Sequence, residues 1–118
     1  MNESRRQKRI ASLIQNVLSG ILLEAFQDST SGIISITRVD MSKDLKTANV
    51  YLSLFGTVQK DQVLKQIEDK RGFFRKAIAT KTNLKYNPVL FFSLDPVIEF
   101  ESRLDQIIDK LRKDENSP

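Results

Sequence analysis

Residues 33–55 read IISITRVDMSKDLKTANVYLSLF, and they carry the clearest structural pattern in the chain. Within 48–55 every second residue is apolar, and this period of two indicates a strand with one buried face. Residues 33–39 are rich in β-branched side chains, which also favours a strand. The residues between these segments include Ser42 and Asp44, whose side chains stabilise turns, so we expect the two strands to pair as a hairpin.

Amphipathic helical spacing precedes and follows the hairpin. Apolar residues recur every three or four positions within 10–25, which predicts a helix over residues 4–28. The same spacing runs through 63–78 across Gly72. Because a glycine inside a helix costs about 1 kcal/mol relative to alanine and permits a bend, we expect two helices that meet at this glycine.

The last part of the chain supplies one more strand and one more helix. Residues 89–94 have the composition of a strand, and Asp95 followed by Pro96 is typical of a helix N-terminus. The order helix, strand, strand, helix, helix, strand, helix predicts an α+β domain with helices packed on one face of a three-stranded sheet. We assign residues 1–113 to this single domain and residues 114–118 to a frayed C-terminal tail.

The composition excludes most catalytic chemistry. The 118 residues include no cysteine and no histidine, so the chain cannot form a thiolate or imidazole metal site or a His-dependent triad. It has only four glycines, and their spacing forms no GxGxxG or Walker loop. The remaining candidates are carboxylate pairs such as Asp40 with Asp44, in positions that offer no burial to raise a pKa. We therefore expect no enzymatic activity, no metal and no cofactor.

Positive charge is concentrated in two segments. The net charge is only +4, yet residues 1–9 carry four bases and one acid, and residues 60–90 carry eight bases and three acids. Two separate basic segments favour a polyanionic partner, either nucleic acid or an anionic membrane surface. Polar residues interrupt the apolar run of 10–25 before it reaches the roughly 20 residues that span a membrane, so we expect a cytoplasmic protein.

The basic residues are the candidate contacts to such a polyanion, because lysines and arginines that neutralise phosphates release counterions and thereby drive binding. Around the expected bend lie Lys70, Arg71, Arg75, Lys76, Lys81 and Lys85. The first turns of the first helix hold Arg5, Arg6, Lys8 and Arg9, and the hairpin turn is flanked by Lys43 and Lys46. For each group the alternative is a solvated face without a ligand.

Two pairs in the hairpin also have two interpretations. Tyr51 and Phe55 share a strand face, as base-stacking residues do on an RNA-recognition sheet, but we expect helices to cover that face. Ser42 and Asp44 are polar residues with functional potential. We expect them to act structurally, through hydrogen bonds within the turn.

The element order and the local sequence together resemble a known family. The order of the first six elements is that of a type II KH domain, although the GxxG loop is absent, since the junction between the central helices has the single glycine Gly72. The hairpin fits the run V-x-x-S-x-D-L-x-x-A-x-V-Y-x-S of bacterial ribosome-binding factor A, and later residues fit that family's closing pattern of proline, apolar strand, aspartate and helix. The matching residues are Val39, Ser42, Asp44, Leu45, Ala48, Val50, Tyr51 and Ser53, then Pro88, Phe91 or Phe92, Asp95, Ile98 and Arg103.

This resemblance implies a KH-like, RNA-binding factor of ribosome biogenesis. We expect a monomer that binds the free small (30S) ribosomal subunit, but not assembled ribosomes, and assists late maturation and processing of its 16S ribosomal RNA. The family's interhelical kink, Ala-x-Gly, corresponds here to Lys70, Arg71 and Gly72. We expect no membrane and no small-molecule substrate as partners. The alternative is a protein-binding adaptor that uses the KH-like scaffold without direct RNA contact.

Overall fold

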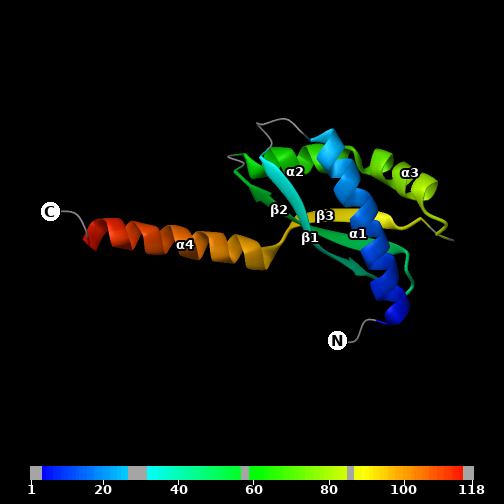
Figure 1. Ribbon diagram of the computed structural model, residues 1–118, viewed down its shortest axis with the longest axis horizontal. Coiled ribbons are helices and arrows are strands. Elements are labelled where there is room, and N and C mark those ends of the chain that lie inside the picture. The colour runs from blue at the N-terminus through cyan, green and yellow to red at the C-terminus, as the bar shows by residue number, and fades with distance from the viewer. Residues whose placement is uncertain (1–3, 27–31, 57–58, 85–86, 116–118) are drawn as a thin grey trace.

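The computed structural model describes residues 4–26, 32–56, 59–84 and 87–115. Its elements follow the predicted order (Figure 1). They are α1 (Arg5–Ala25), β1 (Ile33–Met41), β2 (Thr47–Phe55), α2 (Lys60–Asp69), α3 (Arg71–Lys81), β3 (Val89–Leu94) and α4 (Pro96–Glu115). None of the helices described is long and apolar enough to cross a membrane.

The three strands form one mixed sheet with β2 in the centre. β1 pairs antiparallel with β2, so that Ile33 lies opposite Phe55 and Met41 opposite Ala48. β3 pairs parallel with β2, and the chain crosses between these two strands through α2 and α3. The predicted hairpin and the predicted α+β architecture are both confirmed.

Side chains inside the turn hold the hairpin together. The Ser42 hydroxyl donates to Asp44 Oδ1 at 2.6 Å and accepts the backbone N–H of Thr47 at 3.0 Å, while the N–H of Lys46 donates to Asp44 Oδ1 at 3.1 Å. This network encloses Leu45, whose φ of 63° lies in the left-handed region that residues other than glycine seldom adopt. The structural interpretation of Ser42 and Asp44 is therefore confirmed.

The start of α1 is fixed to the end of β1. Ser4 and Gln7 form a capping box, in which the Ser4 hydroxyl accepts the Gln7 N–H and Gln7 Oε1 accepts the Ser4 N–H. The buried side chain of Gln7 then donates from Nε2 to the carbonyl of Met41 at 3.0 Å. The first turns of α1 consequently hold a defined position beside the hairpin turn.

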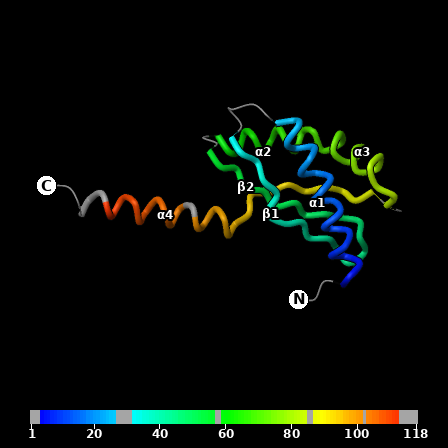
Figure 2. Tube along the Cα trace, viewed as in Figure 1, coloured from blue at the N-terminus to red at the C-terminus, as the bar shows by residue number. Residues whose placement is uncertain are grey.

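Three helices cover one face of the sheet. The inward residues of β2 are buried together with apolar residues of α1, α2 and α3, in a core that includes Ile14, Leu18, Val50, Leu52, Ile67, Phe74, Ile78 and Leu90. Figure 2 shows α1 crossing the sheet with α2 and α3 beside it. The buried face is the one predicted from the alternation in residues 48–55.

The opposite face of the sheet is open. Phe55 is 73% exposed, Asn49 and Phe91 are exposed, and Tyr51 is half-buried. The expectation that helices cover Tyr51 and Phe55 is therefore wrong. The physical reason is that α1, α2 and α3 all pack on the more apolar face of the sheet. The alternate residues of each strand, on the other face, are therefore not covered by these helices.

The bend between the central helices falls at Lys70, the first of the residues 70–72 expected to form the kink, and two residues before Gly72. Lys70 has φ −94° and ψ 14°, which ends α2 and begins α3. Gly72 is the second residue of α3, and a Cβ added there would meet no atom within 4 Å. The bend therefore comes from the backbone of Lys70, and the helix does not need the conformational freedom of the glycine.

A bulge in β1 connects the sheet to α4. The pairing register shifts between Ile36 and Arg38, and this frees Thr37 to donate its hydroxyl proton to Asp95 Oδ2 at 2.6 Å. Asp95 Oδ1 accepts the N–H of Val97 at 2.9 Å, which confirms Asp95 as the cap of the last helix. A strand residue far away in sequence thus holds the residue from which α4 begins.

Beyond this cap α4 projects from the body of the domain, giving the molecule a length of 64 Å (Figures 1 and 2). A salt bridge joins the first turn of α4 to α2, with Lys60 Nζ on α2 lying 3.0 Å from Glu99 Oε1 on α4. Its apolar stripe is exposed, with Val97, Phe100, Leu104, Ile107, Ile108 and Leu111 in solvent. The helix extends to Glu115, two residues into the segment that the sequence assigned to the tail.

Candidate nucleic-acid interface

The candidate RNA contacts fall into two groups in space. Lys70, Arg71, Arg75 and Lys76 lie at the junction of α2 and α3 or in the first turns of α3. The second group, here called the basic end, lies where the start of α1, the hairpin turn and the end of α3 meet. It consists of Arg5, Arg6, Lys8, Arg9, Lys43, Lys46 and Lys81, all exposed. Lys85 lies outside the described residues.

Arg75 has a structural task. Its Nε donates to the carbonyl of Pro88 and its Nη2 to the carbonyl of Asn87, both at 3.1 Å. Asn87 returns a hydrogen bond from Nδ2 to the carbonyl of Arg75 at 2.8 Å. These three bonds fix the chain at the entry to β3. The guanidinium of Arg75 is therefore committed to the fold, which makes Arg75 a weaker candidate for RNA contact than the sequence suggested.

Two further cations at the junction pack against aromatic rings. The ammonium of Lys70 lies 5.1 Å from the ring centre of Phe26, at the end of α1. The guanidinium carbon of Arg71 lies 5.5 Å from the ring centre of Phe91, on the open face of the sheet. Both distances suit cation–π contacts, so these side chains help to join α1, α3 and β3. Lys76 is exposed on α3.

The basic end brings together three segments that are far apart in sequence. In Figure 1 the start of α1, the turn between β1 and β2 and the end of α3 lie at the same end of the molecule, opposite α4. A groove of about 490 Å³ opens between them. It is lined by Arg6, Arg9, Ile10, Leu13, Leu45, Asn83 and Leu84. A hollow among Arg5, Arg6 and Arg9 continues the groove along α1.

The charges of the basic end are almost uncompensated. None of its seven cations forms a salt bridge with any residue in the described part of the chain. Among the described residues of these segments the one carboxylate is Asp44, and the hydrogen bond from Ser42 lowers its pKa below the usual value, so it stays ionised. Arg5 and Arg6 occupy the first turn of α1, which contains no acidic residue. Positive charge there opposes the helix dipole and destabilises the helix.

Several groove residues were not identified from the sequence. Leu45 lies in the hairpin turn, and Leu84 follows the end of α3. The sequence alone gives no signal that these two leucines line one groove with Ile10 and Leu13. The left-handed conformation of Leu45 is equally hidden, since leucine has no preference for it. Only the tertiary fold reveals this apolar floor beneath the arginines. Within the described ranges no cluster of acidic residues could hold a metal ion.

Comparison with known proteins identifies the family. The sequence profile of ribosome-binding factor A matches residues 6–108, nearly the whole chain. The chain belongs to the ribosome-binding factor A family. Curated members from Dehalococcoides mccartyi and Coxiella burnetii are 38% and 36% identical to it. The match covers 92% of this chain and 93% of the first relative, and 97% of this chain and 96% of the second.

Solved structures of the family share the fold. A solution structure from Thermotoga maritima is 31% identical, has a TM-score of 0.60, and is matched over 80% of this chain and 92% of its own. The crystal structure of ribosome-binding factor A from Thermus thermophilus has a TM-score of 0.65 at 18% identity, over 75% and 94% of the two chains. A homology model of the Thermus factor, fitted into a cryo-EM map of its complex with the 30S subunit, has a TM-score of 0.63, also at 18% identity, over 74% and 92% of the two chains. These likenesses confirm the KH-like fold.

Proposed function

We propose that this protein is a non-enzymatic, monomeric factor that binds the free small ribosomal subunit and assists late maturation of its 16S ribosomal RNA. Membership of the ribosome-binding factor A family supports this function, as does the 30S complex described for the Thermus relative. The observation that carries the RNA contact is the basic end, where seven cations from three segments converge without salt bridges to described residues. The protein acts in the cytoplasm and needs no cofactor.

The mechanism is preferential binding to one state of the subunit. A factor shifts an equilibrium only by the difference between its affinities for the two states. It must therefore bind the immature or free small subunit more tightly than the subunit within an assembled ribosome. By holding RNA helices in one arrangement it raises the population of the form that is processed, and it leaves when the mature particle no longer offers the binding surface.

The experiment is co-sedimentation with ribosomal particles on a gradient that resolves free small subunits, large subunits and assembled ribosomes. We expect the protein to migrate with free small subunits alone. Binding should weaken with a slope in log salt of roughly −0.7 to −0.9 per phosphate neutralised. The double variant Arg6→Glu/Arg9→Glu should lose co-sedimentation while keeping its circular-dichroism spectrum.

The matched control is Lys65→Glu/Lys110→Glu, which changes the net charge by the same amount at exposed positions on α2 and α4, away from the basic end. It should co-sediment like the wild type. Equal losses in both double variants would mean that overall charge decides binding. Absence of the wild-type protein from every particle at low salt would refute the assembly function.

The protein-binding adaptor is the second candidate, and the exposed apolar stripe of α4 favours it. An apolar interface responds little to salt, whereas phosphate contacts respond steeply. Salt-insensitive migration with small subunits that survives Arg6→Glu/Arg9→Glu would indicate a ribosomal protein as the contact. The stripe would then be the first surface to test, through Leu104→Glu and Ile107→Glu.

A further inference from the structure

We propose that the groove at the basic end binds one unpaired nucleotide of an RNA strand, with its base on the apolar floor and its phosphates on Arg6 and Arg9. This inference rests on the proposed function and specifies the ligand of the basic end. It concerns a groove between α1, the hairpin turn and α3. The junction of α2 and α3, where other KH domains carry their GxxG loop, lies elsewhere on the molecule.

The floor of the groove suits the face of a base. Ile10, Leu13, Leu45 and Leu84 come from three different segments and form one apolar surface. Apolar side chains hold an unstacked base by contact with its flat face. Such contacts tolerate any base, because every base has a flat face. Leu45 reaches this surface from a left-handed backbone position that the turn network maintains. Strained backbone of this kind is concentrated at functional sites.

The rim of the groove suits the backbone of the same nucleotide. Arg6 and Arg9 line the groove, and they also line a second hollow together with Arg5 on α1. A guanidinium binds phosphate oxygens through two parallel N–H donors, which fixes orientation as well as charge. Asn83, also on the lining, offers an amide donor and acceptor to the edge of a base.

The size and the two-part chemistry of the groove favour an unpaired nucleotide over a duplex. Its volume of about 490 Å³ lies within the roughly 300–1,000 Å³ typical of sites for small organic ligands. In an RNA duplex the base faces are stacked, so a duplex can contact the arginines but cannot reach the apolar floor. A strand with one splayed base can use both parts, and the groove thereby distinguishes the two forms.

Amide chemical shifts in a ¹H–¹⁵N spectrum test the proposal directly. The probes are an eight-nucleotide single-stranded RNA of mixed sequence, a blunt RNA duplex of the same length, and inorganic phosphate. We expect the single strand to change the amide chemical shifts of Leu13, Leu45, Asn83 and Leu84. The duplex and inorganic phosphate should leave these four chemical shifts unchanged. Arg6→Glu/Arg9→Glu should raise the Kd for the single strand at least tenfold. The control Lys65→Glu/Lys110→Glu should raise it less than threefold.

A second variant separates the floor from the charge. Leu13→Ala removes part of the floor without changing any charge, and Leu13 is partly exposed, so the fold should persist. It should reduce the preference for the single strand over the duplex, while leaving duplex binding unchanged. Equal preference in Leu13→Ala and wild type, or floor shifts of equal size with the duplex, would overturn the proposal.

Co-sedimentation distinguishes failure of this inference from failure of the proposed function. If the wild-type protein migrates with small subunits but the single strand leaves the floor amides unshifted, the nucleotide site is wrong and the assembly function stands. If the protein neither migrates with small subunits nor responds to the single strand, both fail. Shifts confined to the residues around Arg71 and Phe91 would also reject the groove, since they would place the strand at the α3–β3 side of the sheet.

Discussion

Arg75 and Arg6 are the same residue type, yet the structure uses them differently. Arg75 donates to the carbonyls of Asn87 and Pro88 and holds the entry to β3. Arg6 is exposed beside a groove and forms no salt bridge with a described residue. Reversing the charge of Arg75 would remove fold contacts as well as charge, so a loss of RNA binding in such a variant would be ambiguous. Arg6 gives the cleaner experiment.

Asp95 makes stability depend on pH. The hydrogen bond from Thr37 lowers the pKa of Asp95 below its usual value of 3.8, and the N–H of Val97 acts in the same direction. Because the pKa is lower in the folded state, this carboxylate contributes stability above about pH 3.8 and loses it as the pH falls through the folded pKa. The wild-type protein should therefore be more stable than Asp95→Asn at pH 6.

The measurement is urea unfolding of both proteins at pH 6 and pH 3. The difference between them should shrink at pH 3, because this pH lies below the ordinary pKa of 3.8 and the Asp95 carboxyl of the unfolded wild-type chain then binds a proton. Asp109→Asn, an exposed carboxylate on α4, serves as the control and should track the wild type at both values. A constant gap between wild type and Asp95→Asn across this range would show that the cap works without its charge.

Among the elements, α1 begins in an arrangement that stability alone would not select. Its capping box is well formed, but its first turn holds Arg5 and Arg6 and no acid. Cations at a helix N-terminus each cost roughly 0.3–1 kcal/mol at low salt, and anions there gain a similar amount. The helix therefore retains charges that weaken it, which fits a surface kept for a polyanion.

We predict that Arg5→Glu/Arg6→Glu raises the free energy of unfolding by about 1 kcal/mol at low salt. Thermal and urea unfolding measure the gain, which should shrink at high salt because the dipole interaction is screened. The same variant should bind small subunits more weakly. A decrease in stability would mean that these arginines make contacts within the fold, and it would remove the argument that they are retained for binding.

For the molecule as a whole, the body and α4 should be energetically separate. No buried apolar residue of the described core comes from α4. Among the described residues, the polar ties of α4 to the body are the Asp95 cap and the Lys60–Glu99 pair. We predict that removing residues 101–118 lowers the free energy of unfolding by less than about 1 kcal/mol, since exposed helix adds little burial. Urea unfolding gives the value, and a larger loss would reveal packing of α4 on the body in solution.

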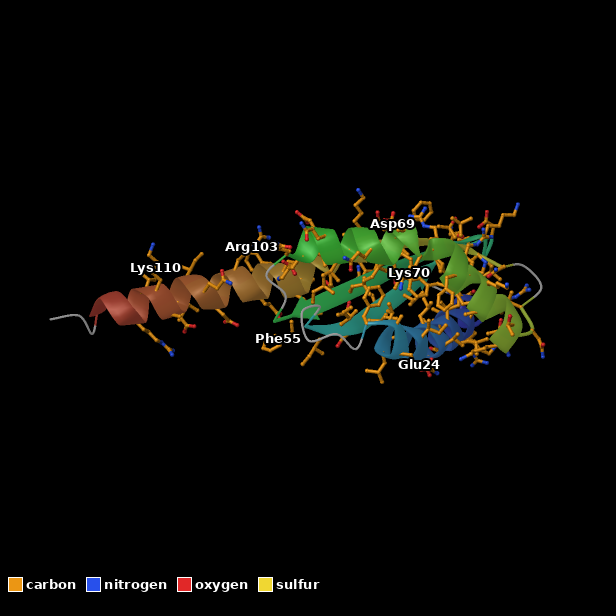
Figure 3. All side chains as sticks on the ribbon, turned by 90° about the horizontal axis from the view of Figure 1, so that it is seen from above. Glu24, Phe55, Asp69, Lys70, Arg103 and Lys110 are labelled. Carbon is orange, nitrogen blue, oxygen red and sulfur yellow. The ribbon has the colours of Figure 1, made fainter. Side chains whose placement is uncertain are left out.

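The sequence predicted the elements well, because their signals are local. The alternation in β2, the spacing in α1 and the Asp95–Pro96 start of α4 each depend on neighbouring residues, and all three are confirmed. The bend was centred on Gly72 because glycine weakens a helix, but it falls at Lys70, the first residue of the expected kink 70–72. The helices expected over Tyr51 and Phe55 pack on the other face of the sheet. The sequence could not show this, because the face that three helices cover depends on how they pack together. Figure 3 shows Phe55 at the end of the body from which α4 leaves.

The interface was only partly predictable, for the same reason. Charge clustering along the chain identified Arg6 and Arg9, and their role as RNA contacts stays a prediction. Spacing could not reveal that Leu45 and Leu84 form a floor beneath them, because this requires the turn, α1 and the end of α3 to meet. The spacing also could not reveal that the guanidinium of Arg75 is hydrogen-bonded within the fold. Its partners lie 12 and 13 residues away, on a segment without regular structure.

The way in which α4 joins the body has a mechanical consequence. Twenty residues of helix extend about 30 Å from Asp95, and they are rigid compared with the short connection at their base. A tilt of about 10° around Asp95 moves the far end by about 5 Å on that length. Thr37, at the bulge in β1, bonds directly to the residue around which such a tilt would turn. A small change of angle there would displace a surface that carries Arg103, Lys110 and the apolar stripe (Figure 3).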